Sequence, residues 1–253
     1  MKIGISALLF NIEEALEICK KIDEINHIEI GIDNLYECKK LHEYKDAIDN
    51  LGLSIGIHLP MELNSCENIE YISKSWINFI KEIDSNLTCF DIKYFNFHLG
   101  YVISDRLNKN RNKYLDNSIK FIENINIKSN AKLSIENVYS NRGDFSNVGN
   151  KTYDFEYIFN RVNNKNVCFC YDTGHYLINN DNYIERLNDK INVIHLSDND
   201  GISDMHIGIG KGILHESHVK KVLNLNPDYL VLEINYKHID DSINKLSSII
   251  EEV

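Results

Sequence analysis

Eight short apolar segments are the feature that most limits how this chain can fold. Most are rich in β-branched or aromatic residues, and each is followed by sequence of helical character. Buried parallel strands have this composition, because both of their faces are covered by other parts of the protein. We therefore predict strands near residues 2–6, 27–31, 53–58, 93–98, 132–136, 167–172, 192–196 and 229–233.

The stretches between these strands carry apolar residues at helical spacing, most clearly in 12–25, 69–83, 115–127 and 240–253. Eight alternations of strand and helix within 253 residues match the α/β architecture of the (β/α)8 TIM barrel, which typically needs about 250 residues. A doubly wound sheet is the alternative, but it often has a glycine-rich first turn, and the first turn here reads ISALLFN. No linker or low-complexity tract divides the sequence, so we expect a single TIM-barrel domain over residues 1–253.

Side chains that can bind metals stand at or just after the ends of six of these strands. One such histidine alone would be an ordinary hydrogen-bonded loop residue, but all strand ends of a parallel barrel open onto one face, where these side chains would meet. Crowded carboxylates repel one another unless a cation neutralises them. Histidine combined with carboxylate suits zinc, manganese or cobalt better than calcium. The nine candidate ligands are His58, His98, Glu136, Asp172, His175, His195, Asp204, His206 and Glu233.

Three further features have two interpretations each. Asn137 follows Glu136 and either contacts substrate or orients the carboxylate. The run HIGIGKGI, residues 206–213, is either a tight turn alone or a turn whose backbone amides, with Lys211, contact an anion. The remaining histidines lie in expected helices or at strand starts, where we expect surface positions: His27, His42, His215, His218 and His238.

The net charge of −11 disfavours nucleic acids and anionic membrane surfaces as partners, because an acidic surface repels phosphate groups. No apolar stretch approaches the roughly 20 residues needed to span a bilayer, and the first residues lack the pattern of a signal peptide. The six cysteines are scattered without a C-x-x-C pair, which favours free thiols in a reducing compartment. We therefore expect a cytoplasmic protein that does not bind membranes.

The motifs SIEN, YDTGH, HLSDND with DMHIGIGKG, and VLEIN resemble the xylose-isomerase-like TIM-barrel superfamily, which contains sugar isomerases, sugar epimerases and endonuclease IV. For the isomerases and epimerases, the resemblance implies one divalent ion of zinc, manganese or cobalt. It implies Glu136, Asp172, His195 and Glu233 as the ligands of this ion. It also implies that Glu136 and Glu233 move a proton beside a carbonyl, while His175 binds substrate.

For endonuclease IV, the resemblance implies three zinc ions held by all nine candidate ligands, and cleavage of DNA at abasic sites. The loop GIDNLYEC lacks the arginine, and the loop HLPMELNSC lacks the tyrosine, with which that nuclease contacts DNA. We therefore expect a metal-dependent isomerase or epimerase of a sugar or sugar phosphate, with one ion favoured and residues for up to three. The alternatives are an endonuclease IV-like phosphodiesterase and a barrel that binds a metal-chelated ligand without turnover. Barrels of this group commonly associate, so a homo-oligomer is a further expectation.

Overall fold

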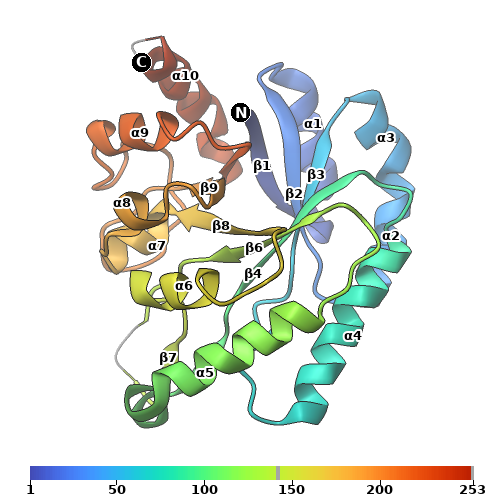
Figure 1. Ribbon diagram of the computed structural model, residues 1–253. Helices are drawn as coiled ribbons and strands as arrows, with labels where there is room; N and C mark the ends of the chain where they lie inside the picture. The colour runs from blue at the N-terminus through green and yellow to red at the C-terminus, as the bar shows by residue number, and fades with distance from the viewer. Residues whose placement is uncertain (141–142, 252–253) are drawn as a thin grey trace.

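The computed structural model describes residues 1–140 and 143–251. Within these ranges, eight parallel strands close into a barrel in which the last strand pairs with the first (Figure 1). The eight expected strands and the TIM-barrel fold class are confirmed. The barrel strands, in chain order, are β1 (Lys2–Leu8), β2 (Ile25–Gly31), β3 (Ser54–His58), β4 (Ile92–His98), β6 (Lys132–Glu136), β8 (Val167–Asp172), β9 (Ile191–Leu196) and β10 (Tyr229–Leu232).

Helices follow the strands and cover the outside of the barrel (Figure 1). Among the described residues, no helix has the length and apolar character needed to cross a membrane. The helices are α1 (Ile12–Lys21), α2 (Leu35–Leu41), α3 (Lys45–Asn50), α4 (Glu70–Asn86), α5 (Ser104–Asn124), α6 (Thr152–Phe159), α7 (Thr173–Ile178), α8 (Tyr183–Leu187), α9 (Glu216–Leu223) and α10 (Ile239–Ile250), with 3₁₀ turns η1 (Leu9–Asn11), η2 (His42–Tyr44) and η3 (Tyr236–His238).

Three of the four expected helical stretches correspond to α1, α4 and α10, although residues 252 and 253 of the last stretch lie outside the described residues. The fourth, α5, begins at Ser104 rather than at residue 115. Its first half is polar and therefore shows no continuous apolar stripe. The backbone also leaves helical geometry at Asn110, with φ −140° and ψ 35°, which separates the polar half from the amphipathic half.

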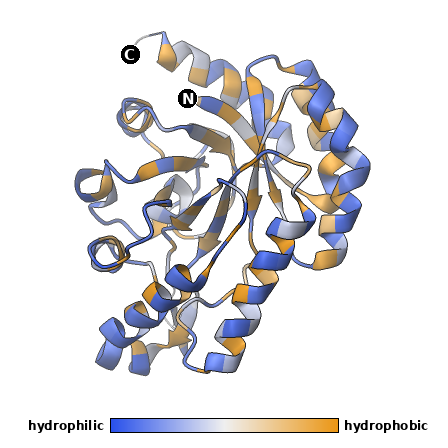
Figure 2. Cartoon of the chain, turned by 45° about the vertical axis from the view of Figure 1, so that its right-hand side comes forward, coloured by the Kyte–Doolittle hydropathy of each residue, from blue (hydrophilic) through white to orange (hydrophobic). Residues whose placement is uncertain are grey.

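The main hydrophobic core lies between the barrel and its helices. In β2, for example, Ile28 and Ile30 are fully buried and alternate with His27 and Glu29. Side chains of a strand alternate between its two faces, so one face of β2 is apolar and the other polar. Figure 2 shows the same segregation more widely, with hydrophobic residues along the barrel strands and on stripes of the surrounding helices. The apolar layer stabilises the fold and leaves the barrel interior free to carry polar groups.

A two-stranded antiparallel sheet of β5 (Tyr101–Ile103) and β7 (Phe145–Asn147) was not predicted. Each strand has three residues, too few to show an alternating pattern. The pair joins the loop after β4 to the polar loop expected at 137–151, of which residues 141 and 142 lie outside the described part. Both loops follow strands that end in candidate ligands, so this small sheet ties together two loops at the ligand-bearing end of the barrel.

Candidate metal centre

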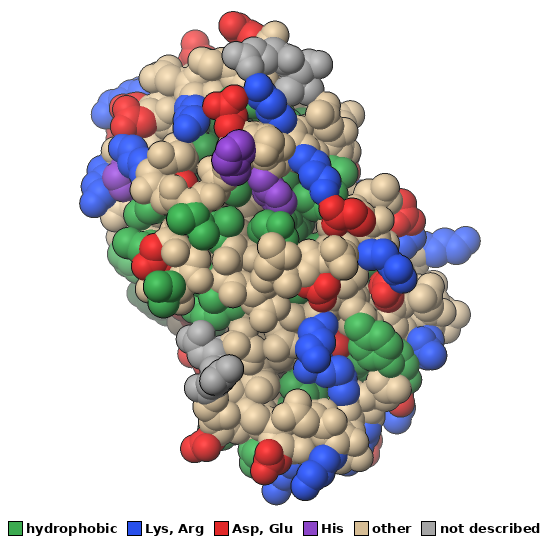
Figure 3. All heavy atoms as spheres, turned by 90° about the vertical axis from the view of Figure 1, so that its left-hand side faces the viewer, with side chains coloured by type: hydrophobic (Ala, Val, Ile, Leu, Met, Phe, Trp, Pro, Cys, Tyr) green, Lys and Arg blue, Asp and Glu red, His purple; other side chains and the backbone are tan. Residues whose placement is uncertain are grey.

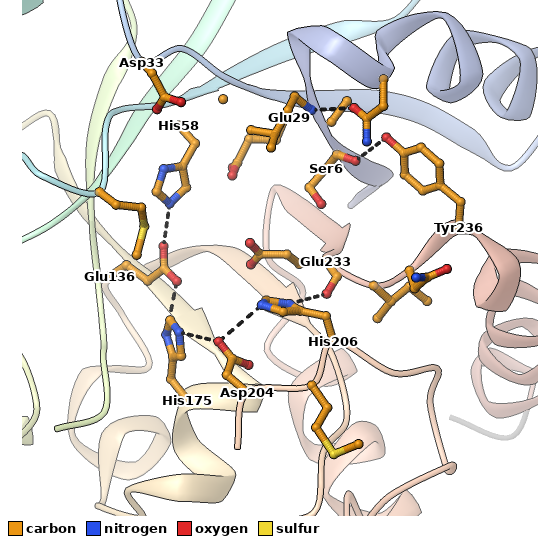
Figure 4. Close-up of a pocket in the computed structure, with 18 of the residues that line it drawn as sticks. Ser6, Glu29, Asp33, His58, Glu136, His175, Asp204, His206, Glu233 and Tyr236 are labelled. Atoms are coloured by element: carbon orange, nitrogen blue, oxygen red, sulfur yellow. Dashed lines mark hydrogen bonds and ion pairs between the residues drawn. The ribbon is translucent and has the colours of Figure 1, made fainter. Parts of the chain in front are cut away.

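Glu136, the last residue of β6, lies at the centre of the candidate site. Nitrogen atoms of four histidines each lie 3.4 Å from its carboxylate oxygens, namely His58 Nε2, His98 Nε2, His175 Nδ1 and His195 Nδ1. The carboxylate is 1% exposed. Figure 4 shows Glu136 between His58 and His175, with all three pointing into one cavity. Residues far apart in sequence therefore meet because their strands end at the same face of the barrel.

Strand register brings several of these residues together. The pairing of β4 with β6 sets His98 opposite Glu136, and the pairing of β8 with β9 sets Asp172 opposite His195. Glu233 directly follows β10, and its Oε2 lies 2.9 Å from His195 Nδ1. Neighbouring strands therefore present their candidate ligands at the same height in the barrel.

Four of the candidate ligands could hold one metal ion. The ligand atoms of Glu136, Asp172, His195 and Glu233 all lie within 4.8 Å of one another. Zinc binds such atoms at about 2.0–2.2 Å, so a common ion requires only small adjustments. Asp172 Oδ2 is buried and has no hydrogen-bond partner within the described residues. Buried polar atoms without partners are rare, and a cation bound beside His195 Nδ1 would satisfy this oxygen.

The other candidate ligands form two further groups. His58, His98 and Glu136 also lie within 4.8 Å of one another, so Glu136 belongs to two groups. Asp204 Oδ2 lies 3.2 Å from His175 Nε2 and 3.2 Å from His206 Nε2. All nine candidate ligands therefore gather at the site, and the arrangement could hold up to three ions.

The carboxylates at the site stabilise positive charge on the groups beside them. Against the effect of burial, the Glu136 carboxylate raises the pKa of His58 to about 9. Burial raises the pKa of Asp172 to about 7, with the Glu136 carboxylate adding to the shift and His175 opposing it. Against burial, His195 lowers the pKa of Glu233 to about 2. Without a metal, protons on those histidines whose pKa is raised, such as His58, supply the charge that the carboxylates need, whereas burial lowers the pKa of His98. A divalent ion would replace these protons.

Asn137 lies in contact with the backbone at the end of β8. Its side-chain Nδ2 donates to the carbonyl of Asp172 at 2.9 Å, and its Oδ1 accepts from the Asp172 amide at 2.8 Å. The ring Nδ1 of His175 lies 2.8 Å from the Asn137 carbonyl. Asn137 therefore orients the segment that carries Asp172 and His175.

The glycine-rich run folds around a carboxylate of the chain itself. The amides of Gly210 and Gly212 donate to Asp198 Oδ2 at 2.9 and 2.8 Å, and the amide of Leu214 donates to Asp198 Oδ1 at 2.8 Å. The ammonium of Lys211 pairs with Asp241 at 2.8 Å. The backbone amides of this turn thus bind an internal anion, and the Lys211 charge is directed to α10.

Sequence reasoning missed Glu29 and Asn96. Glu29 Oε2 lies 3.0 Å from His195 Nε2, and Asn96 Nδ2 donates to Glu136. Both stand at alternate positions of otherwise apolar strands, IEI and FNF, a signal that could have identified them. The expected surface position of His27 is wrong. Its side chain is 0% exposed, because β2 begins at Ile25 and turns His27 into the barrel.

A cavity of about 860 Å³ opens above the metal groups. Glu14, Glu29 and Asp33 add acidic groups to its lining, and Lys237 adds a basic one. Leu8, Met61 and Met205 contribute apolar surface. Such a mixture of polar and apolar groups lining a cavity is typical of a pocket for a small molecule.

The chain is similar in sequence and in structure to known proteins. The family model for the xylose isomerase-like TIM barrel matches residues 26–252. The chain is 28% identical to uncharacterized protein MJ1614 of Methanocaldococcus jannaschii over 253 aligned positions, 95% of each chain. The solved structure of a D-tagatose 3-epimerase-like protein has a TM-score of 0.86 at 22% identity, covering 100% of this chain and 98% of that one. Endonuclease IV from Thermus thermophilus has a TM-score of 0.69 at 16% identity, covering 100% of both chains.

Proposed function

Because the chain belongs to the xylose isomerase-like TIM-barrel family, we propose that it is a divalent-metal-dependent isomerase or epimerase of a sugar or sugar phosphate. The observation that carries the proposal is the pair of carboxylates Glu136 and Glu233. Their oxygens lie 3.4 and 2.9 Å from His195 Nδ1. Figure 4 shows both side chains directed into the cavity from separate strands. A substrate held between them would have a carboxylate on each side.

Proton transfer beside a carbonyl needs a base close to the carbon and stabilisation of the charge that develops. A divalent ion bound by Glu136, Asp172, His195 and Glu233 supplies that stabilisation by polarising the carbonyl. In our proposal, one glutamate oxygen removes the proton from the carbon, and the other returns a proton on the opposite face or to the neighbouring carbon. The first outcome is epimerisation and the second is isomerisation. His175, whose Nε2 lies 3.2 Å from Asp204, would contact a substrate oxygen.

The cavity supports a substrate rich in hydroxyl groups. Carboxylates accept hydrogen bonds from hydroxyls, and Asn11 and Asn235 in the lining can donate as well as accept. A long polyanion such as DNA would instead meet an acidic protein. On the face seen in Figure 3, lysine and arginine side chains are interspersed with aspartate and glutamate rather than gathered in one patch. This face therefore lacks the continuous basic patch that is typical of nucleic-acid binding.

Phosphoester hydrolysis is the second candidate. It is favoured by the two ligand groups that a one-metal mechanism does not use, His58 with His98, and His175 with His206 around Asp204. Several metal ions in one site can activate water and stabilise both oxygens of a phosphoester cleavage. This candidate predicts three bound ions, whereas the sugar reaction needs one.

Metal stoichiometry separates the two candidates. The protein would be purified without chelator, dialysed against metal-free buffer and analysed for zinc, manganese and cobalt. We expect one tightly held equivalent per chain, together with conversion of a ketose or ketose phosphate when that metal is present. Three tightly held ions, with hydrolysis of phosphodiesters and no conversion of any sugar, would replace the isomerase proposal with the hydrolase.

A further inference from the structure

A chain of buried polar side chains runs down the barrel interior from His195. It contains Glu29, Tyr94, His27 and Ser54, which are 1%, 0%, 0% and 6% exposed. The mechanism proposed above gives no role to Tyr94, His27 or Ser54. Four buried polar groups in one line are costly unless each is hydrogen-bonded, so their contacts indicate what they do.

The contacts run from one group to its neighbour. Glu29 Oε2 lies 3.0 Å from His195 Nε2. Burial raises the pKa of the Tyr94 hydroxyl well above its usual value, and the charge and hydrogen bonding of the neighbouring Glu29 carboxylate add to the shift. Tyr94 Oη lies 2.9 Å from His27 Nε2, and His27 Nδ1 lies 2.9 Å from Ser54 Oγ. Each group therefore touches the next, from the candidate metal ligand down to the far end of the barrel.

Two glycines make room for this chain. A Cβ at position 56 would lie 2.3 Å from Tyr94 Cζ, and a Cβ at position 4 would lie 2.8 Å from His27 Cδ2. Real Cβ atoms do not come so close to other atoms, so any other residue would displace the rings. Gly4 and Gly56 belong to β1 and β3, the strands on either side of β2. The barrel is therefore shaped to admit both rings.

The donors and acceptors of these side chains favour one direction for the hydrogen bonds between them. As a carboxylate, Glu29 can only accept, so it accepts from both His195 Nε2 and the Tyr94 hydroxyl. Tyr94 has given its single proton and must accept from His27 Nε2. Burial lowers the pKa of His27 to about 3, so its ring is neutral. Its Nδ1 can then accept from Ser54 Oγ at 2.9 Å, the shorter of two contacts of this hydroxyl, since Ser54 Oγ also lies 3.3 Å from the Asn26 carbonyl oxygen as a donor.

We infer that Tyr94 and His27 are positioning residues that hold the Glu29 carboxylate against His195 Nε2, so that His195 presents Nδ1 to the metal site. His195 Nδ1 is the atom that lies 2.9 Å from Glu233 and 3.9 Å from Asp172. Groups behind a metal-bound histidine commonly fix its tautomer and its orientation. Without the Tyr94 donor, the buried carboxylate would lose a group that fixes its orientation, and His195 would lose its support. This inference rests on the proposed metal site.

The test compares metal affinities, measured by competition with a chromophoric chelator in the full-length protein. Tyr94→Phe removes one buried hydroxyl and keeps the ring, and we expect it to weaken zinc binding about tenfold, the lower end of the effect typical of groups behind the ligands. The matched control is Tyr183→Phe, which removes a hydroxyl from a tyrosine that is 1% exposed in α8 and outside the chain of contacts. The control should bind zinc as the wild type does.

A double-mutant cycle provides the readout that a purely structural role would not move. If Tyr94 acts through Glu29, Tyr94→Phe should have little further effect on zinc affinity once Glu29→Gln is present. The same cycle with His27→Gln serves if Tyr94→Phe does not fold. Affinities that fall equally in Tyr94→Phe and Tyr183→Phe, or effects of Tyr94→Phe and Glu29→Gln that simply add, would overturn the inference. A wild-type protein that binds no divalent metal would overturn the metal site and the inference together, whereas unchanged affinity in Tyr94→Phe would overturn the inference alone.

Discussion

Glu136 is the side chain that links the candidate ligands of the site. It contacts four histidines, and it belongs both to the group with Asp172, His195 and Glu233 and to the group with His58 and His98. Glu136→Gln keeps the shape of the side chain but removes its charge and one ligand oxygen. We predict that turnover falls by at least about 10²–10⁴-fold, the contribution of a general acid or base, and that zinc affinity falls with it. Steady-state kinetics and chelator competition measure the two effects.

The matched control for this change is Glu17→Gln, since Glu17 is an exposed glutamate on α1, outside the cavity. Glu17→Gln should retain both zinc affinity and turnover. If Glu136→Gln retained full metal affinity, the assignment of Glu136 as a ligand would be wrong.

Burial of His27 should make the free energy of unfolding depend on pH. Its folded pKa of about 3 lies below the ordinary value of 6.5, because burial disfavours the charged ring. The native state therefore excludes a proton that the unfolded chain takes up below pH 6.5. On lowering the pH from 7 to 5, this group alone should reduce the free energy of unfolding by about 2 kcal/mol. Urea unfolding of metal-free protein at several pH values, compared with His27→Gln, isolates the contribution.

In His27→Gln, this part of the pH dependence should disappear, even though the variant is less stable at neutral pH. Parallel pH profiles of the wild type and the variant would show that folding does not lower the pKa of His27, contrary to its burial.

At the scale of elements, the strands and their ends could be predicted from sequence. Buried parallel strands are short continuous apolar runs, and the register of a barrel sets their last residues side by side, as with His98 and Glu136. Whether a side chain is buried depended more on its position within a strand than on its residue type. His27 was assigned to the surface because the strand was expected to begin there, whereas β2 already begins at Ile25.

Features that depend on distant partners could not be predicted. Each strand of the β5–β7 sheet has three residues, and its pairing joins segments about 40 positions apart. The glycine-rich run left open a turn alone or a turn that contacts an anion, and its amides bind Asp198, which lies before the turn in the same loop. Sequence shows that amides are free to bind an anion but not whether the protein supplies that anion itself.

The loop after β9 yields a prediction at this scale. Asp198 accepts from the amides of Gly210, Gly212 and Leu214, and a Cβ at position 212 would lie 2.1 Å from the Asn199 carbonyl oxygen. Asp198→Asn would turn an NH₂ group toward backbone amides that need an acceptor. We predict a loss of about 2–3 kcal/mol in the free energy of unfolding. Urea unfolding measures it.

The control is Asp200→Asn in the same loop, because an asparagine Oδ1 can still accept from the amides of Ile202 and Ser203 as Asp200 does. Its stability should stay within about 0.5 kcal/mol of the wild type, as for ordinary surface substitutions. Equal losses in the two variants would mean that the Asp198 carboxylate has no special role in the turn.

For the whole molecule, net charge decides which partners are attracted. At −11, the protein should bind abasic-site DNA poorly, because contacts between cations and phosphates supply most non-specific DNA affinity. We predict a dissociation constant weaker than about 10⁻⁴ M for an abasic duplex even at low salt. Fluorescence anisotropy with zinc, manganese or cobalt present measures it. Tight binding with a steep salt dependence would favour the nuclease alternative.

The central claim is that Glu136 and Glu233 move a proton beside a carbonyl. The most direct measurement is incorporation of solvent deuterium into a sugar. Metal-loaded protein would be incubated in D₂O with a panel of ketoses and ketose phosphates and followed by proton NMR. We predict deuterium at the carbon beside the carbonyl of one substrate. This incorporation should disappear when the metal is chelated and in Glu233→Gln. The central claim would be contradicted if the wild type nicked abasic DNA, if Glu233→Gln abolished this nicking, and if no deuterium entered any sugar of the panel.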